Sequence, residues 1–150
     1  MIVLVVGSNA ATSREGWHWT SPGDLPTLEL LSGQNELINQ IVALGKPTCG
    51  FVNSGPPLNI SNLINAVPAV VQCWFLGQEG GYAMVDALFG DVNPRGKLPV
   101  SFPRSAGHIP AYYSSQPSSR LGSNLGFPVI PFFAFGYGWG ETIFQFCNLN

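Results

Sequence analysis

The chain has 150 residues, of which six are Lys or Arg and eight are Asp or Glu, so that charged residues make up only 9% and the net charge is −2. So few basic residues remove the electrostatic basis for binding nucleic acid or an anionic membrane surface. No apolar run approaches the roughly 18 residues needed to cross a bilayer. A hydrophobic content of 45% is enough for a packed core, and the length predicts one domain that spans the whole chain.

The first third of the chain predicts two strands and a helix. Residues 2–6 are a continuous run of aliphatic side chains, which favours a strand buried on both faces. Residues 8–32 form a polar and aromatic connection whose length favours a functional role. Residues 34–44 carry apolar side chains at helical spacing and end before a glycine, and residues 48–52 predict the second strand.

The middle of the chain continues the alternation. Ser61 is expected to cap a short helix, and residues 69–75 predict a third buried strand. The glycine-rich turn at residues 77–81 leads into a helix that ends near Phe89, and residues 98–102 predict a further strand. This order of elements is typical of a parallel sheet with helices on both faces. After it the sequence is rich in Ser, Pro and Gly without clear periodicity.

Cysteine usage and the first residues give two further expectations. Cys49, Cys73 and Cys147 are far apart and include no CxxC pair, so they fit neither a disulfide framework nor a zinc site. We expect buried free thiols at Cys49 and Cys73 and no metal. Met1 is followed by five apolar residues without a basic region, too few for a signal peptide, so none is predicted and the compartment stays open.

Three connections follow the carboxyl ends of predicted strands, where open α/β sheets bind ligands. They are residues 7–32, 53–58 and 77–81. The last reads GQEGG and lacks both the GxGxxG pattern and the Lys-Ser/Thr of a P-loop, so its glycines are expected to let helix and strand approach closely. No cofactor is predicted.

The first of these connections concentrates unusual side chains. Arg14, Glu15, Trp17, His18 and Trp19 lie together in a chain with few charges. This composition resembles a sugar site, because aromatic faces stack on pyranose C–H groups while a carboxylate and a guanidinium bind hydroxyls. A carboxyl beside two indoles would be partly desolvated, which raises its pKa and suits it to general-acid work. The alternative is an aromatic loop that packs on its own core or on a neighbour, with Glu15 paired to Arg14.

The chain contains several short motifs in a recognisable order. They are SREG (13–16), GQNELI (33–38), GKP (45–47), GQEGG (77–81), LFGDVNPRGKLPVSFP (88–103), IPAYY (109–113) and FGYG (135–138). Together they resemble the C-terminal α/β-sandwich domain of glycoside hydrolase family 3, the β-glucosidases and β-xylosidases, over nearly the whole chain. The block at residues 88–103 is long and unusual, which makes it the most specific part of the resemblance.

The resemblance implies both a fold and an activity. The fold would be a flavodoxin-like three-layer sandwich with a mostly parallel sheet of about five or six strands. The activity would be retaining, exo-acting hydrolysis of β-linked glucosides or xylosides. In the family a preceding (β/α)8-barrel domain carries the nucleophilic Asp, and a Glu-Gly loop of the sandwich domain carries the acid/base. That motif falls on Glu15, whose carboxyl should lie about 5 Å from the nucleophile.

Two departures from the family pattern concern the site. Residues 17–19 read Trp-His-Trp where many relatives carry an acidic residue or Arg. The candidates for binding the substrate, Arg14, Trp17, His18 and Trp19, thus rest on the composition of this connection rather than on the family pattern. No Asp of the chain lies in a segment that resembles the nucleophile motif, and no barrel is present.

Three hypotheses follow. In the first, the chain supplies the acid/base half of an enzyme and is completed by a barrel domain or chain. In the second, it is a non-catalytic carbohydrate-binding or assembly module derived from the family. In the third, the chain hydrolyses glycosides alone, with Glu15 and a local carboxyl as the pair.

Overall fold

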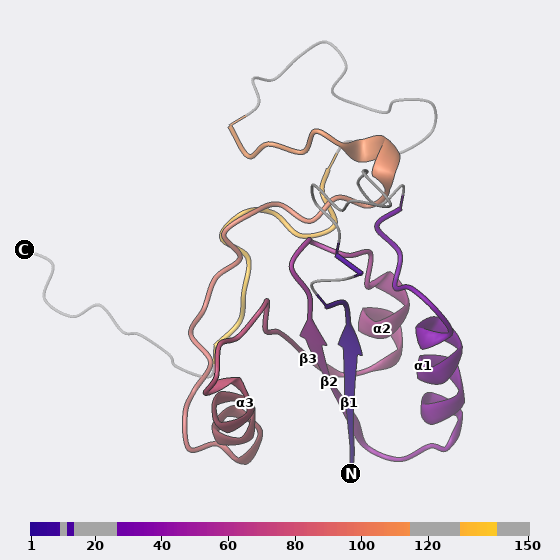
Figure 1. The fold of residues 1–150 in the computed structure, drawn as a ribbon, viewed down its shortest axis with the longest axis vertical. Coiled ribbons are helices and arrows are strands. Elements are labelled where there is room, and N and C mark those ends of the chain that lie inside the picture. The colour runs from indigo at the N-terminus through magenta and orange to yellow at the C-terminus, as the bar shows by residue number, and fades with distance from the viewer. Residues whose placement is uncertain (10–11, 14–26, 115–129, 141–150) are drawn as a thin grey trace, which may run out of the picture.

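The computed structural model describes residues 1–9, 12–13, 27–114 and 130–140. Strands and helices alternate from the first described residues to the middle of the chain (Figure 1). In chain order they are β1 (Ile2–Gly7), α1 (Gln34–Ala43), β2 (Thr48–Asn53), α2 (Ser61–Ala66), β3 (Ala69–Gln72), α3 (Gly80–Phe89) and the short 3-10 helix η1 (Ala106–His108).

The three strands form a parallel sheet in the order β1-β2-β3. Gly7 lies opposite Asn53, and Val52 lies opposite Gln72, so the carboxyl ends of all three strands meet at one edge. The parallel α/β architecture and the strands predicted at residues 2–6 and 48–52 are confirmed. The burial on both faces expected for residues 2–6 is wrong, because Val3 and Val5 are exposed. Within the described residues the sheet has three strands.

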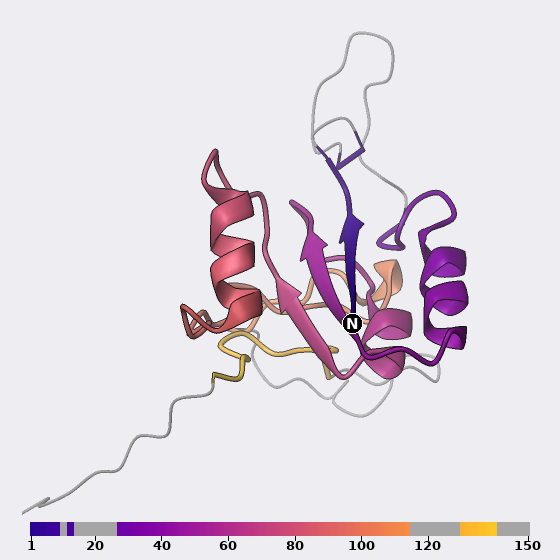
Figure 2. The ribbon, with the colours of Figure 1, turned by 90° about the horizontal axis from the view of Figure 1, so that it is seen from below.

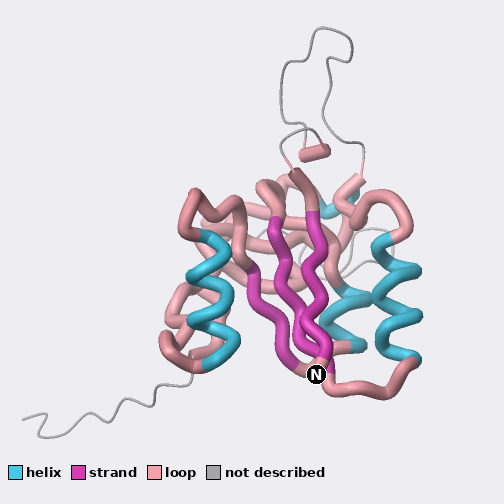
Figure 3. The backbone as a smooth tube through the Cα atoms, turned by 60° about the horizontal axis from the view of Figure 1, so that its bottom comes forward, coloured by secondary structure: helices cyan, strands magenta, loops and turns pink. Residues whose placement is uncertain are grey.

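Helices cover both sides of this sheet. In Figures 2 and 3, α1 and α2 lie on one side of the strands and α3 lies on the other. Side chains alternate accordingly along β1, because successive residues of a strand point to opposite faces. Leu4 and Val6 are buried in the cluster that contains α1 and α2, whereas Val3 and Val5 are 42% and 54% exposed. The side that faces α3 is therefore only partly covered.

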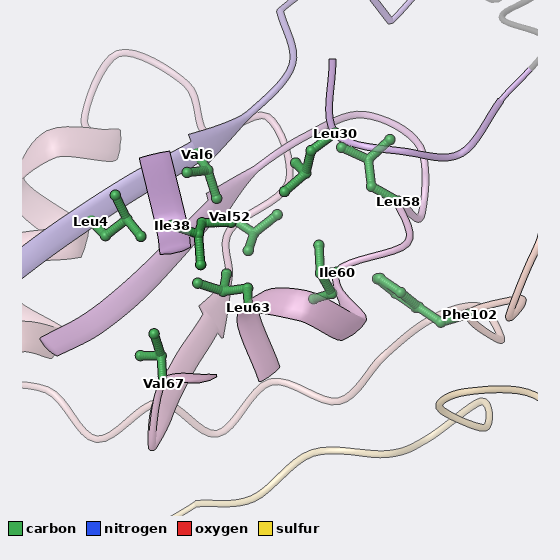
Figure 4. Close-up of a cluster of buried hydrophobic side chains, with 10 residues drawn as sticks. All are labelled: Leu4, Val6, Leu30, Ile38, Val52, Leu58, Ile60, Leu63, Val67 and Phe102. Atoms are coloured by element: carbon green, nitrogen blue, oxygen red, sulfur yellow. The ribbon is translucent and has the colours of Figure 1, made fainter. Parts of the chain in front are cut away.

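The core lies between the sheet and the helices α1 and α2 (Figure 4). Ile38 of α1, Leu63 of α2 and Val52 of β2 are completely buried. Gly50 lies where β2 passes α2, and a Cβ there would come within 3.2 Å of Leu63, so the glycine permits the close approach. The members of the cluster are Leu4, Val6, Leu30, Ile38, Val52, Leu58, Ile60, Leu63, Val67 and Phe102.

The helices agree with the sequence except at one cap. The predicted helix at residues 34–44 is confirmed as α1, and α3 ends before Gly90, which adopts the left-handed conformation with φ 84°. The cap predicted at Ser61 is wrong, since Ser61 is the first residue of α2 and no side chain caps this helix.

Two strand predictions need correction. The third strand stops at Gln72 rather than at residue 75, because Trp74 takes φ 58° and turns the chain. Residues 98–102 do not form a strand. Pro99 lacks an N–H for a ladder, and only Phe102 forms a β-bridge, in antiparallel orientation, with Phe133.

The remaining expectations concern thiols, metals and membranes. Cys73 is buried and Cys49 partly buried, and both are free; burial raises the pKa of the Cys73 thiol. Cys147 lies outside the described residues. Within the described ranges, no group of three His, Cys, Asp or Glu side chains could hold a metal ion. No helix there has the length and apolar character of a membrane span.

Candidate active site

The predicted site residues Arg14, Glu15, Trp17, His18 and Trp19 lie outside the described residues. The structure describes the chain on either side of them, up to Ser13 and again from Thr27. These two chain ends therefore define where the segment of residues 14–26 is attached.

The first chain end leaves the carboxyl end of β1. Gly7 has φ 138°, and a Cβ at this position would lie 1.9 Å from the carbonyl oxygen of Asn53, so only glycine fits. The N–H of Ser8 then donates to the same carbonyl oxygen at 2.8 Å. The hydroxyls of Ser8 and the buried Ser13 are hydrogen-bonded at 2.8 Å. Ser8 is thus bonded to β2, and Ser13, the last described residue before the segment, is bonded to Ser8.

A turn follows directly after Ser8. The N–H of Thr12 donates to the side-chain oxygen of Asn9 at 3.0 Å, and the N–H of Ser13 donates to the carbonyl of Asn9 at 2.7 Å. Asn is favoured in such turns because its short side chain bonds the backbone nearby. The turn directs Ser13 back over the end of β1.

The second chain end returns along the neighbouring connection. Glu29 forms a parallel bridge with Asn59, whose side-chain amide donates to the Glu29 carboxylate at 2.7 Å. The N–H of Asn59 donates to the carbonyl of Leu28 at 2.7 Å, and Leu30 is buried in the core. This end is therefore held by both backbone pairing and apolar packing.

The connection after β2 is held by hydrogen bonds of buried side chains. Ser54 is fully buried, and its hydroxyl donates to the carbonyl of Pro56 at 2.9 Å. The same hydroxyl accepts a hydrogen bond from the side-chain amide of Gln72 at 3.1 Å. The Oε1 atom of Gln72 is buried without a hydrogen-bond partner. Sequence reasoning missed Ser54 and Gln72, although both lie within one residue of a strand end.

Three aromatic rings pack together just after the end of β3. Trp74, held at φ 58°, packs against Phe102 with ring centroids 5.8 Å apart. Phe102 in turn meets the ring of Phe133 edge-on at 6.1 Å. Through Phe102, the block at residues 88–103 thus contacts Trp74, two residues after the end of β3.

The third connection, residues 77–81, is largely exposed. A Cβ at Gly80 would lie 2.5 Å from the Cβ of Leu76, a residue of the connection between β3 and α3, so this glycine permits a close turn rather than the predicted approach of helix and strand. A Cβ at Gly77 or Gly81 would meet nothing within 4 Å. Glu79 is exposed and precedes α3 without forming a side-chain cap. His108, elsewhere in the chain, is half-buried and accepts a hydrogen bond from the backbone N–H of Arg104 at 3.4 Å.

Comparison with known proteins identifies the relatives of this chain. Residues 1–141 match the family described as the glycosyl hydrolase family 3 C-terminal domain. A β-xylosidase of Formosa agariphila is 38% identical over 149 residues, which cover 97% of this chain and 20% of that protein. A periplasmic β-glucosidase of Salmonella typhimurium is 35% identical over 163 residues, covering 100% of this chain and 20% of that protein.

A solved structure agrees with these relatives. A β-glucosidase from Erythrobacter marinus superposes with a TM-score of 0.86 at 39% identity, covering 93% of this chain and 18% of that one. The chain therefore spans about a fifth of the length of the relatives it matches. The motifs at residues 13–16 and 88–103 lie within the matched range.

Proposed function

Because the chain belongs to the glycosyl hydrolase family 3 C-terminal domain family, we propose that it supplies the acid/base half of a retaining site for terminal β-D-glycosidic bonds. The position of the described residues on either side of residues 14–26 carries this proposal. Both ends of that segment are fixed at the carboxyl edge of a parallel sheet, where this class of fold binds ligands. The relatives are named β-xylosidase and β-glucosidase, which supports a β-xyloside or β-glucoside as substrate.

Glu15 is the proposed acid/base. An Asp of a partner barrel attacks the anomeric carbon, and the Glu15 carboxyl protonates the departing oxygen. The Glu15 carboxylate then takes a proton from water, which attacks the glycosyl-enzyme and releases the sugar. Arg14, Trp17, His18 and Trp19 bind the sugar through its hydroxyls and its apolar face. The chemistry requires no metal or cofactor.

The partly covered side of the sheet supports a further part of the proposal. Val3 and Val5 of β1 and Tyr82 and Phe89 of α3 are all exposed apolar side chains. The described sheet adds no strand beyond β1. We propose that residues 1–150 form one domain, that its flavodoxin-like sheet reaches five or six strands, and that a (β/α)8-barrel covers part of this surface.

A hybrid enzyme tests this function. The chain replaces the matching segment of the Salmonella typhimurium periplasmic β-glucosidase, and hydrolysis of aryl β-glucosides and β-xylosides is measured for the hybrid and for the chain alone. We expect turnover by the hybrid and none by the chain, because the two carboxyls come from different parts of the protein.

Two results would contradict the proposal. Glu15-dependent turnover by the chain alone would make it a self-contained enzyme. A folded hybrid that lacks turnover, but whose tryptophan fluorescence still changes with added sugar, would make the chain a binding module. Circular dichroism confirms that the hybrid is folded.

A further inference from the structure

The side chain of Gln34 joins Gly7 to Leu31, which lie before and after the connection that contains residues 14–26. Its Oε1 accepts a hydrogen bond from the N–H of Gly7 at 2.7 Å. Its Nε2 donates to the carbonyl of Gly7 at 2.9 Å and to the carbonyl of Leu31 at 2.9 Å. Gly7 ends β1, and Leu31 lies three residues before α1, so one amide connects both ends of the interval of residues 8–30.

The free edge of β1 explains why this contact matters. The N–H groups of Ile2 and Ser8 donate to the β2 side, at Pro47 and Asn53. Because peptide groups alternate in direction along a strand, those of Gly7 point to the opposite edge, which no strand pairs in the described sheet. The Gln34 amide takes the place that a neighbouring peptide would occupy.

Both chain ends also adopt unusual backbone conformations. Gly7 has φ 138°, and Ser32, next to Leu31, has φ 59°. For Ser32 this left-handed conformation costs free energy that its surroundings must offset. The N–H of Gln34 donates to the carbonyl of Ser32 at 2.9 Å. Main chain and side chain of Gln34 therefore hold both unusual positions at once.

We propose that Gln34 is a positioning residue for Glu15. Its amide fixes the separation and direction of the two chain ends, and through them the approach of the Glu15 carboxyl to the departing oxygen. This inference rests on the proposed function. Small misplacements of an acid lower the rate of proton transfer steeply, so a change at Gln34 should affect the steps that need a proton.

Hydrogen exchange of the chain itself tests the anchoring. The variants are Gln34→Ala and, as a matched control on the same helix, Gln40→Ala. Gln40 is exposed, and its side-chain amide donates to the Glu36 carboxylate four residues earlier. We expect the Gly7 amide to exchange at least about tenfold faster in Gln34→Ala, because it loses its acceptor. The amides of Phe51 and Val52 in β2 should be unchanged, and Gln40→Ala should match the wild type. Unchanged Gly7 exchange, or equal acceleration throughout the sheet, would overturn the anchoring role.

Leaving-group dependence in the hybrid enzyme tests the positioning. Dinitrophenyl β-glucoside departs without a proton, whereas phenyl β-glucoside needs one. We expect Gln34→Ala to lower kcat/KM for the phenyl substrate about tenfold more than for the dinitrophenyl substrate. Gln34→Glu fills the same volume and keeps an acceptor for Gly7, but it cannot donate to either carbonyl, and it should shift the ratio in the same direction.

The possible results separate the two proposals. A merely structural role of Gln34 predicts that both substrates slow equally, which would overturn the inference. If Glu15→Gln shifts the substrate ratio and Gln34→Ala does not, only the positioning role fails. If Glu15→Gln leaves the ratio unchanged, the proposed function fails and the positioning role fails with it.

Discussion

Replacing Glu15 with glutamine is expected to lower kcat/KM of the hybrid enzyme for phenyl β-glucoside by about 10²- to 10⁴-fold. The amide is nearly isosteric with the carboxyl but can neither give a proton to the departing oxygen nor take one from water. The loss should shrink for dinitrophenyl β-glucoside, whose departure needs no acid. Initial rates at several substrate concentrations give kcat/KM for each combination of hybrid enzyme and substrate.

Matched controls come from carboxylates elsewhere in the chain. Glu36 in the first turn of α1 and Glu79 before α3 are both exposed. Glu36→Gln and Glu79→Gln should leave the rates within about twofold of the wild type, since surface substitutions rarely change stability or geometry. A Glu15→Gln hybrid with wild-type rates on phenyl β-glucoside would remove Glu15 from the mechanism.

The Gly7→Ala variant should lose about 3 kcal/mol or more of its free energy of unfolding. The new Cβ would lie 1.9 Å from the carbonyl oxygen of Asn53, and alanine rarely adopts a φ of 138°. To relieve this steric clash, the carboxyl end of β1 must separate from β2. That separation also breaks the contacts of Gln34. Urea denaturation of the chain, followed by circular dichroism, measures the change.

Gly96→Ala is the appropriate comparison for this variant. A Cβ at Gly96 meets nothing within 4 Å, and its φ is not in the positive region. We expect a change within about 0.5 kcal/mol for this control. Equal midpoints for Gly7→Ala and the wild type would mean that the end of β1 lies differently from the geometry described above.

The sequence predicted the elements whose pattern is local. The strands at residues 2–6 and 48–52 and the helix at residues 34–44 follow from side-chain periodicity and flanking glycines, which act within one element. The helix cap at Ser61 and the strand at residues 98–102 were wrong. Phe102 pairs instead with Phe133, a partner 31 positions away that no local pattern reveals.

The edge of the sheet at which the first connection begins and ends was predictable, but the contacts that hold its ends were not. The rule that ligands bind at the carboxyl ends of parallel strands directed attention to residues 7–32, and both described ends of that segment lie there. Gln34, by contrast, reads in sequence as an ordinary first residue of a helix. Its role rests on hydrogen bonds across 27 positions, which only the folded arrangement of β1 and α1 brings together.

The distance between the Glu15 carboxyl and the nucleophilic carboxyl tests the central claim most directly. It can be measured in a crystal structure of the hybrid enzyme whose nucleophile has been labelled with an activated 2-fluoro-glucoside. We expect a separation of about 5–5.5 Å across the bound sugar, as retaining hydrolysis requires. A Glu15 side chain packed inside the core, or lying at the amino-terminal edge of the sheet, would contradict the account.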